Sequence, residues 1–392
     1  MFDFDSIIER KSDKCRKWDH SFVSSRFGAV PEDFIPLWIA DMDFKAPHGV
    51  LEAYQYVISH GVIGYTDTPE SLYESIIAWE QRHHQLTVKK SEILFFSGVL
   101  AGITTALQAF TEPNDAILIL YPVYPPFAQI ITTNRRKLIR SRLIEENGRF
   151  IMDLADIEEK FKHEKIRLMI LCNPHNPGGR VWTRDELHQL GELCKKYSVL
   201  VLSDEIHQDL VFAPHEMTSF VDAGDSFSDF SVQFTSMTKT FNLAGIKNSI
   251  AFVKNERLKK QLTHKQEENF QQEINTFGLV GMEAAYRTGD TWLKELLDYL
   301  QGNVAYTLDF FQKHLPRATI MKPEGTYLLW VDFSSYGFSD EELENLLVHK
   351  GKVVLNTGVS YGPSGKQHMR LNVACPRKIL EDGLQCIVTA LN

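Results

Sequence analysis

Two hydrophobic patterns alternate along residues 47 to 204. Short apolar runs predict strands, and apolar positions spaced three or four apart predict helices. The predicted strands are 93–96, 116–120, 138–143, 167–172 and 199–202, and the predicted helices are 47–59, 71–84, 98–110, 153–163 and 183–197. The last helix begins at Thr183, with Glu186 three residues later as a capping box. Strands alternating with helices predict an α/β fold with a mostly parallel sheet flanked by helices on both faces.

The pattern changes in the last quarter of the chain. Residues 256–289 predict a long, interrupted helix, and 292–314 predict a second one. Short strands follow at 318–321, 327–332, 352–355 and 369–373, with helices at 339–350 and 376–391. This tail predicts a smaller α+β domain. We expect an N-terminal segment, 1–46, packed on the small domain and the active site, a large domain, 47–289, and a small domain, 290–392.

Composition narrows the classes of protein and of site. The chain has 392 residues and a net charge of -9, which argues against nucleic acid as a partner. Its five cysteines are scattered without a CxxC pair, which favours thiols in a reducing cytoplasm over a disulfide frame or a metal site. The acidic start lacks the layout of a signal peptide, and no apolar run is long enough to span a membrane. We therefore expect a cytoplasmic protein with no membrane partner.

Lys239 is the first candidate for chemistry. It lies among hydroxyl residues, follows an apolar run predicted as a strand, and precedes a second cation, Lys247. This arrangement suits a Schiff base to an aldehyde cofactor that carries a phosphate: Lys239 would form the imine, while Ser236, Thr238 and Lys247 would face the phosphate. The alternative is a surface lysine in a polar loop.

A glycine turn offers a second phosphate contact. Ser97 to Gly102 stands where a predicted strand turns into a helix, so the backbone N–H groups of Gly98, Val99 and Leu100 favour an anion. Simple close packing of the helix on the strand is the alternative.

Three polar or aromatic side chains follow the ends of predicted strands, where ligands of parallel sheets bind. Asp204 could pair with a protonated pyridine nitrogen, because a carboxylate at the end of a buried strand needs a partner. Asn176, in an Asn-Pro-His-Asn-Pro-Gly-Gly loop, could bond a ring oxygen, and Tyr124 could stack on a flat ring. Each could instead be structural: Asp204 as a cap or ion-pair partner, the other two as ordinary turn residues.

The last candidates concern an amino-acid substrate. Arg370 alternates with apolar residues in a predicted strand, and its fork suits an α-carboxylate. An arginine on an edge strand facing water is the alternative. Trp38 lies beside Asp41 and Asp43, where it could fill the core or form the wall of a pocket.

Together, and in this order, these pieces resemble the fold type I pyridoxal-phosphate (PLP) enzymes of the class I/II aminotransferase superfamily, and within it the MalY/PatB group of cystathionine β-lyases. The segments that carry the resemblance span nearly the whole chain: 38–44, 64–66, 204–207, 239–245, 323–327 and 370–376. His207 stands where many aminotransferases have a tyrosine, and Lys247 where many have an arginine. Both departures are usual for the lyase group.

The resemblance implies a role for each candidate. Lys239 would carry PLP as a Schiff base, and Tyr65 and Tyr124 would join it as catalytic residues. The other residues implied to hold the cofactor, with Tyr124 counted again, are Gly98, Val99, Leu100, Tyr124, Asn176, Asp204, His207, Ser236, Thr238 and Lys247. The residues implied to hold the substrate are Arg370, Trp38, Ala40 and Asn176. Tyr65 would reach the phosphate of a neighbouring subunit, so that the active unit would be a homodimer.

The activity implied is a β-elimination on L-cystathionine and related S-substituted cysteines, which gives a thiol, pyruvate and ammonia. One alternative is a class I/II aminotransferase, because both reactions use the same residues. Another is a regulatory protein that keeps the cofactor and the fold but acts through a protein partner.

Overall fold

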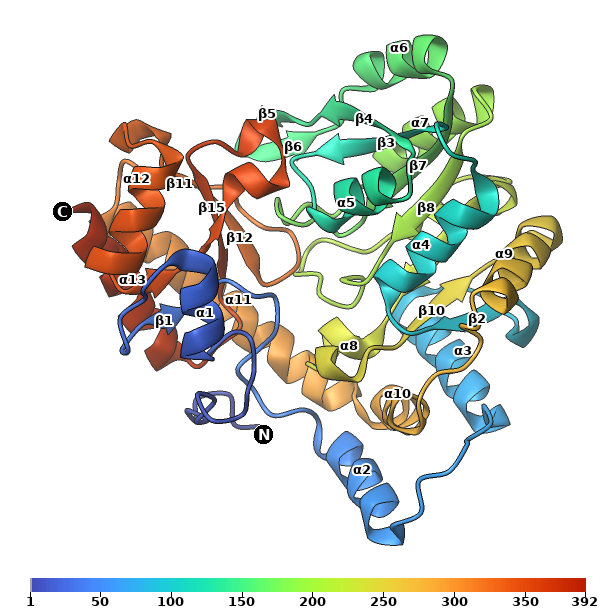
Figure 1. Cartoon of the computed structure of the whole chain (residues 1–392), viewed down its shortest axis with the longest axis horizontal. Coiled ribbons are helices and arrows are strands. Elements are labelled where there is room, and N and C mark those ends of the chain that lie inside the picture. The colour runs from blue at the N-terminus through green and yellow to red at the C-terminus, as the bar shows by residue number, and fades with distance from the viewer. Residues whose placement is uncertain (1) are drawn as a thin grey trace.

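The computed structural model describes residues 2–392 and is built around a seven-stranded sheet (Figure 1). In spatial order the strands are β2 (Ile93–Phe96), β10 (Ser249–Phe252), β9 (Ser231–Thr235), β8 (Leu200–Asp204), β7 (Ile166–Cys172), β3 (Ala116–Tyr121) and β4 (Lys137–Arg142). Only β10 runs antiparallel to its neighbours. The predicted mostly parallel sheet is therefore confirmed.

Helices cover both faces of this sheet because successive strand residues point to opposite sides. On β3, Leu118 and Leu120 pack in one cluster with α6 (Leu154–Glu164) and α7 (Arg184–Lys196). Ile117 and Ile119 pack on the other side. The helices of that second cluster are α4 (Val99–Phe110), α5 (Pro126–Thr133) and α9 (Glu256–Glu268). The predicted capping box is present, since Thr183 and Glu186 exchange hydrogen bonds at the start of α7.

Some short elements escaped the sequence patterns. These are α1 (His20–Phe27), α8 (Met237–Thr240), β10, α5 and the hairpin of β5 (Ile144–Glu146) with β6 (Arg149–Ile151). The long helix predicted at 256–289 is two helices, α9 and α10 (Thr276–Thr288), separated by residues 269–275. At the β2 edge of the sheet, α10 packs with α2 (His48–His60) and α3 (Glu70–His84).

The C-terminal part has a four-stranded antiparallel sheet. Its strands, in spatial order, are β11 (Thr319–Ile320), β12 (Leu328–Asp332), β15 (His368–Asn372) and β14 (Asn356–Thr357). The helices packed with it are α11 (Asp290–His314), α12 (Asp340–Asn345) and α13 (Arg377–Leu391). The strand predicted at 352–355 lies outside this sheet, because β13 (Val353–Val354) pairs with β1 (Ile35–Pro36).

The N-terminal segment therefore contacts the C-terminal part directly, and Figure 1 shows the blue α1 and β1 beside the red helices. Val23, Phe34 and Trp38 share an apolar cluster with Val348 and Val354. The domain limits at residues 46 and 290 stay a prediction. Within residues 2–392, each helix is too short or too polar to cross a membrane.

Candidate active site

Three neighbouring parallel strands, β7, β8 and β9, end at the same edge of the large sheet. Asp204 is the last residue of β8 and lies opposite Cys172, the last residue of β7. On its other side Asp204 lies opposite Phe234 of β9, which leads through Ser236 into α8 and Lys239. Because the three strands are parallel, the loops that follow them meet at this edge.

Lys239 is enclosed by side chains from several elements. Its Nζ donates a hydrogen bond to the backbone carbonyl of Ala40. Burial lowers the pKa of the Lys239 amine to about 8, and Arg370 contributes in the same direction, whereas the carboxylates of Asp41 and Asp204 oppose it. A surface lysine in a polar loop is therefore not what the structure contains.

Asp204 and His207 are buried side chains close enough to interact electrostatically with Lys239. The Asp204 carboxylate accepts a hydrogen bond from the Ile206 N–H at 3.1 Å, and burial raises its pKa to about 7 against the pull of Lys239. Burial, with Lys239 and Arg370 nearby, lowers the pKa of His207 to about 3, so its ring is neutral. Within the described residues, Asp204 has no ion-pair partner and the His207 Nδ1 atom has no hydrogen-bond partner. A buried carboxylate in this state fits a protonated ring nitrogen placed against it.

Arg370 is the buried cation that interacts electrostatically with Lys239. It lies on β15, which pairs with β12 on one side and β14 on the other, so the alternative of an edge-strand arginine is wrong. Its Nη1 donates to Asn176 Oδ1 at 3.2 Å and its Nη2 to the Trp38 carbonyl at 2.7 Å. The guanidinium lies 5.4 Å from the ring centre of Tyr361, and its Nε is buried with no partner among residues 2–392. This unused donor fits a carboxylate ligand.

Tyr124 completes the set near Asp204 and Arg370. Burial raises the pKa of its phenol, and the charges of Arg370 and Asp204 act on it with opposite signs. Its ring packs edge-on against Phe127 of α5, with ring centres 5.7 Å apart. The phenol is therefore protonated, and its ring is held by a buried neighbour.

The hydroxyl residues and the glycine turn lie along the same edge. Strand β10 pairs Ser249 with Phe96 and Ile250 with Thr235, so the residues after β2 and after β9 lie on either side of the start of β10. Ser236 Oγ lies 2.9 Å from Thr238 Oγ1. Gly98 has a φ of +123°, and a Cβ built there would meet open space, so the backbone and not packing requires glycine. The first N–H groups of α4 have no partner within the helix, which is the arrangement that binds an anion. At Gly102, in the same turn, the expected alternative of close packing also holds, since a Cβ there would lie 2.7 Å from the Phe234 ring.

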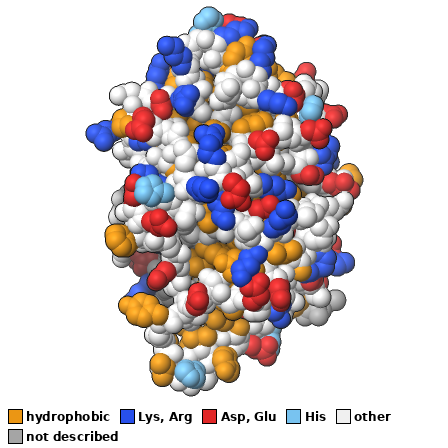
Figure 2. Space-filling view, turned by 90° about the vertical axis from the view of Figure 1, so that its right-hand side faces the viewer, with side chains coloured by type: hydrophobic (Ala, Val, Ile, Leu, Met, Phe, Trp, Pro, Cys, Tyr) orange, Lys and Arg blue, Asp and Glu red, His pale blue; other side chains and the backbone are white. Residues whose placement is uncertain are grey.

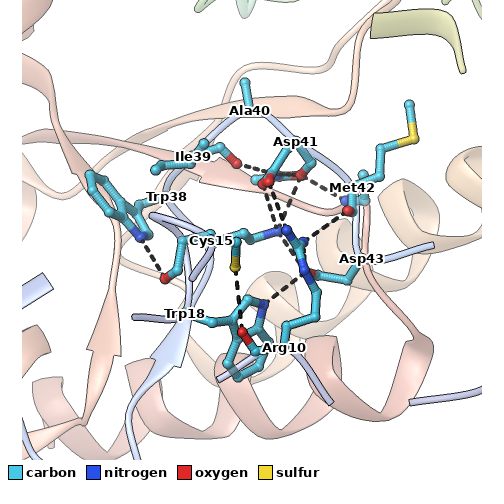
Figure 3. A network of polar contacts seen from close by, with 12 residues as sticks. Arg10, Cys15, Trp18, Trp38, Ile39, Ala40, Asp41, Met42 and Asp43 are labelled. Atoms are coloured by element: carbon cyan, nitrogen blue, oxygen red, sulfur yellow. Dashed lines mark hydrogen bonds and ion pairs between the residues drawn. The ribbon is translucent and has the colours of Figure 1, made fainter. Parts of the chain in front are cut away.

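The loop 38–44 of the N-terminal segment contacts Lys239 through the Ala40 carbonyl, and Figure 3 shows contacts that hold this loop. The Asp43 carboxylate accepts hydrogen bonds from Arg10 Nη1 at 2.6 Å, Lys17 Nζ at 2.7 Å and Trp18 Nε1 at 2.8 Å. Asn372 Nδ2 donates to the Ile39 and Asp41 carbonyls at 2.6 and 2.8 Å. Because the loop is tied at several points, the Trp38 and Ala40 carbonyls are fixed against Arg370 and Lys239.

Comparison with known proteins assigns the chain to a family. The model of aminotransferase class I and II matches residues 32–387. The chain is 39% identical to cystathionine beta-lyase PatB of Bacillus subtilis, over 99% of this chain and 100% of that protein. This chain belongs to the aminotransferase class I and II family. Its backbone is also similar to two solved members of that fold: cystalysin of Treponema denticola, with PLP (TM-score 0.96, 30% identity, 100% and 99% coverage), and a PLP-bound C-S lyase of Staphylococcus hominis (TM-score 0.92, 32% identity, 100% and 98% coverage).

Two residues expected at the site of this family member lie apart from Lys239 within the single chain. Tyr65 is fully exposed in the loop between α2 and α3. Lys247 is exposed too, directly before Asn248, whose carbonyl accepts a hydrogen bond from Ser236 Oγ at 2.6 Å. Lys247 is therefore an exposed neighbour of the residue that contacts Ser236, whereas Tyr65 lies in an exposed loop outside the surroundings of Lys239.

For Trp38, the structure separates side chain from backbone. The indole is buried in the cluster with Val23 and Val354, and only the carbonyl faces Arg370. The sequence left open whether this residue fills the core or lines a pocket. In the structure its side chain fills the core, and its backbone carbonyl lies at the site beside Arg370.

Several residues that shape the site were not among the sequence candidates. Tyr327 donates its hydroxyl to the Ala40 carbonyl at 3.0 Å, and Asn242 Nδ2 donates to the Met42 carbonyl at 2.9 Å. Both lie in segments that carried the family resemblance, so that resemblance was the available signal. Arg10, Lys17 and Tyr361 have no local pattern that marks them, since they act through contacts with distant parts of the chain.

Proposed function

We propose that this protein is a PLP-dependent carbon–sulfur lyase that converts L-cystathionine and related S-substituted L-cysteines to a thiol, pyruvate and ammonia. The observation that carries the proposal is the Lys239 amine, whose pKa burial lowers to about 8 between Asp204 and Arg370. Such an amine is free of its proton in a useful fraction of molecules near neutral pH. The kinship with a cystathionine beta-lyase over the full chain supports the same activity.

The cofactor would be held by residues from four loops. Lys239 would bond its aldehyde, Asp204 would face its ring nitrogen, and Asn176 its ring oxygen. The residues proposed to hold the rest of it are Tyr124 and His207 for the ring, and Gly98, Val99, Leu100, Ser236, Thr238 and Lys247 for the phosphate. When bound, PLP supplies an electron sink for the pair that a broken C–H bond leaves on the substrate.

The substrate would be oriented by Arg370. Its guanidinium is held by the Trp38 carbonyl and by Asn176, while the buried Nε remains a free donor for the α-carboxylate. One short loop joins this fork to Lys239, because the Trp38 carbonyl accepts from Arg370 and the Ala40 carbonyl, two residues later, accepts from the amine. The α-carbon of the substrate would therefore lie close to the amine that removes its proton.

Lys239 would then move one proton. The amino group of the substrate would first displace Lys239 from the aldehyde carbon. The freed Lys239 amine would then take the proton from the α-carbon, and the bond between the β-carbon and sulfur would break with its electron pair leaving on the thiolate. The Asp204 carboxylate would face the ring nitrogen of the cofactor and stabilise its protonated form. The remaining three-carbon fragment is hydrolysed to pyruvate and ammonia.

The second candidate function is transamination, which the name of the matched family favours. In that case Lys239 would return its proton to the cofactor, and the bond between the β-carbon and sulfur would stay intact. Purified enzyme given L-cystathionine distinguishes the two. A lyase releases thiol and pyruvate in equal amounts without an added keto acid. Turnover that needs a keto-acid acceptor and releases no thiol would contradict the proposal.

The active unit would be a homodimer. Large apolar side chains are exposed along α2 and the loop after it: Leu51, Tyr56, Ile58, Val62, Ile63 and Tyr65. Figure 2 shows orange side chains gathered at the lower end of one face, the end at which α2 lies in Figure 1. A second copy covering this surface would bring Tyr65 to the residues that are proposed to hold the phosphate in the partner chain.

We also propose a reducing, cytoplasmic location. The five cysteines are all free thiols, and burial raises the pKa of the Cys172, Cys194 and Cys375 thiols, so these groups stay protonated and unreactive.

A further inference from the structure

One ion pair beside the site takes no part in the proposed reaction. Asp41 follows Ala40, whose carbonyl accepts the hydrogen bond from Lys239. Its Oδ2 lies 3.1 Å from Arg10 Nη2. Its Oδ1 is buried without a hydrogen bond from any described residue and lies 3.7 Å from Lys17 Nζ. Asp41 therefore shares two cations, Arg10 and Lys17, with the carboxylate of Asp43, and lies one residue away from the contact of the catalytic amine.

This ion pair is rigidly held. Figure 3 shows Arg10 reaching Asp41, Asp43 and the Met42 carbonyl at once. Asp43 is in turn bonded by Lys17 and by the indole of Trp18. The side chains of Arg10 and Asp41 are 15% and 20% exposed, so water screens their charges weakly. The charge of Asp41 therefore acts on Lys239 from a fixed position.

Four other polar groups face Lys239. The carboxylate of Asp204 on β8 favours the protonated amine, as Asp41 does, whereas the guanidinium of Arg370 on β15 disfavours it. His207 is neutral, and Tyr327 shares the Ala40 carbonyl as a second donor. During the reaction, PLP would contact Asp204 and the substrate carboxylate would contact Arg370. The charge of Asp41 would remain in place throughout.

We infer that Asp41 and Arg10 are positioning residues for Lys239: their ion pair fixes the loop whose Ala40 carbonyl accepts from the amine, and their two opposite charges set how readily that amine keeps its proton. The inference rests on the proposed role of Lys239 as the base. Removing the Asp41 charge should make the amine lose its proton at lower pH. Removing Arg10 should do the opposite, because Asp41 is then less neutralised. A purely structural role would not produce shifts of opposite sign.

The test compares Asp41→Asn with Arg10→Met in the full-length enzyme. In the PLP-loaded enzyme, an absorbance titration gives the pH at which the nitrogen of Lys239 loses its proton. After PLP is removed, acetylation of Lys239 across pH, measured by peptide mass spectrometry, gives the same quantity for the free amine, near pH 8 in the unmodified chain. We expect Asp41→Asn to lower both midpoints by about one unit and Arg10→Met to raise them by about one unit.

Controls separate charge from folding. Lys294→Met removes an exposed ion pair with Asp298 and should leave both midpoints unchanged. Arg10→Lys keeps the positive charge and should return the midpoint toward that of the unmodified enzyme; it also serves if Arg10→Met does not fold. Shifts of the same sign in Asp41→Asn and Arg10→Met, or none, would overturn the inference. Opposite shifts in an enzyme that forms no pyruvate would leave it standing while the proposed function fails.

Discussion

At the scale of single residues, Lys239 owes its properties to what surrounds it. Its amine lies between two carboxylates and one guanidinium, and burial outweighs the carboxylates, so the pKa falls to about 8. An exposed lysine would keep its proton at neutral pH and could not act as a base. Basicity near neutral pH is therefore a property of the site and not of the lysine alone.

The first prediction concerns this amine. Lys239→Ala should reduce pyruvate formation from L-cystathionine by about a thousandfold or more, because it removes both the attachment point and the base. Steady-state pyruvate assays on the purified variant measure the loss, with Lys294→Ala as a folded control for removal of an exposed lysine. A variant that kept a tenth of the activity would show that another group takes the α-proton.

The second prediction concerns Arg370. Arg370→Lys keeps the charge but loses the fork and cannot contact Asn176 and the Trp38 carbonyl together. We expect KM for L-cystathionine to rise by about tenfold to a hundredfold, with a smaller change in kcat, since the loss is mainly in carboxylate binding. Initial rates over a range of substrate concentrations give both constants. An unchanged KM would place the carboxylate elsewhere.

At the scale of elements, α8 is tied to α3 by a buried polar network. Asp209 accepts hydrogen bonds from Thr240 Oγ1 at 2.6 Å, His84 Nε2 at 2.8 Å and Trp79 Nε1 at 3.0 Å. Thr240 follows Lys239, so this network fixes the helix that carries the catalytic amine. Glu80 lies in the same region, and its pKa is raised to about 7 because burial outweighs the attraction of His84.

The third prediction follows from the sign of that shift. Glu80 keeps its proton in the folded protein up to about pH 7 but loses it near pH 4.5 when unfolded, so its stabilising contribution is complete below pH 4.5 and is lost as pH rises to 7. Relative to Glu80→Gln, the free energy of unfolding of the unmodified protein should fall by at most about 1.4 kcal/mol per pH unit in this window. Urea unfolding at several pH values measures the difference. A difference that does not vary with pH would contradict the assignment.

The sequence predicted most long elements because each carries several periods of its pattern. Strand β10, Ser249–Phe252, was missed although β2 is equally short, because β10 begins with a polar residue whereas Ile93–Phe96 is apolar throughout. The break between α9 and α10 was expected but could not be placed, because Phe270 adopts a positive φ with no glycine or proline to mark it. At the site, Asp204 and Arg370 were found from their positions after and within predicted strands, and Lys239 from the hydroxyl residues around it. The contacts of the Trp38 and Ala40 carbonyls were not, since backbone atoms of a loop leave no trace in residue type.

At the scale of the whole molecule, the single chain leaves an apolar surface exposed along α2 and the loop after it. Tyr65 is 104% exposed, and its loop carries two more apolar residues at its tip, Val62 and Ile63, that are 71% and 58% exposed. Exposure of this much apolar surface along one helix and one loop is typical of an interface between subunits. The structure of a single chain therefore leaves the proposed role of Tyr65 to a second copy.

The fourth prediction tests that interface. Ile63→Glu should shift the purified protein from dimer to monomer and reduce activity by about tenfold or more, because a buried charge opposes association and Tyr65 then leaves the site. Light scattering coupled to gel filtration measures the mass. Ile144→Glu, at an exposed apolar residue of the β5–β6 hairpin, is the control. A fully active Ile63→Glu monomer would show that one chain suffices.

The central claim is that the amine at position 239 carries the pyridoxal group. The most direct test is borohydride reduction of the purified, PLP-loaded protein, followed by proteolysis and mass spectrometry of the peptides. The account predicts one stable pyridoxyl-phosphate adduct per chain, on Lys239, and loss of the imine absorbance on reduction. An adduct on another lysine, or a protein that takes up no PLP, would contradict it.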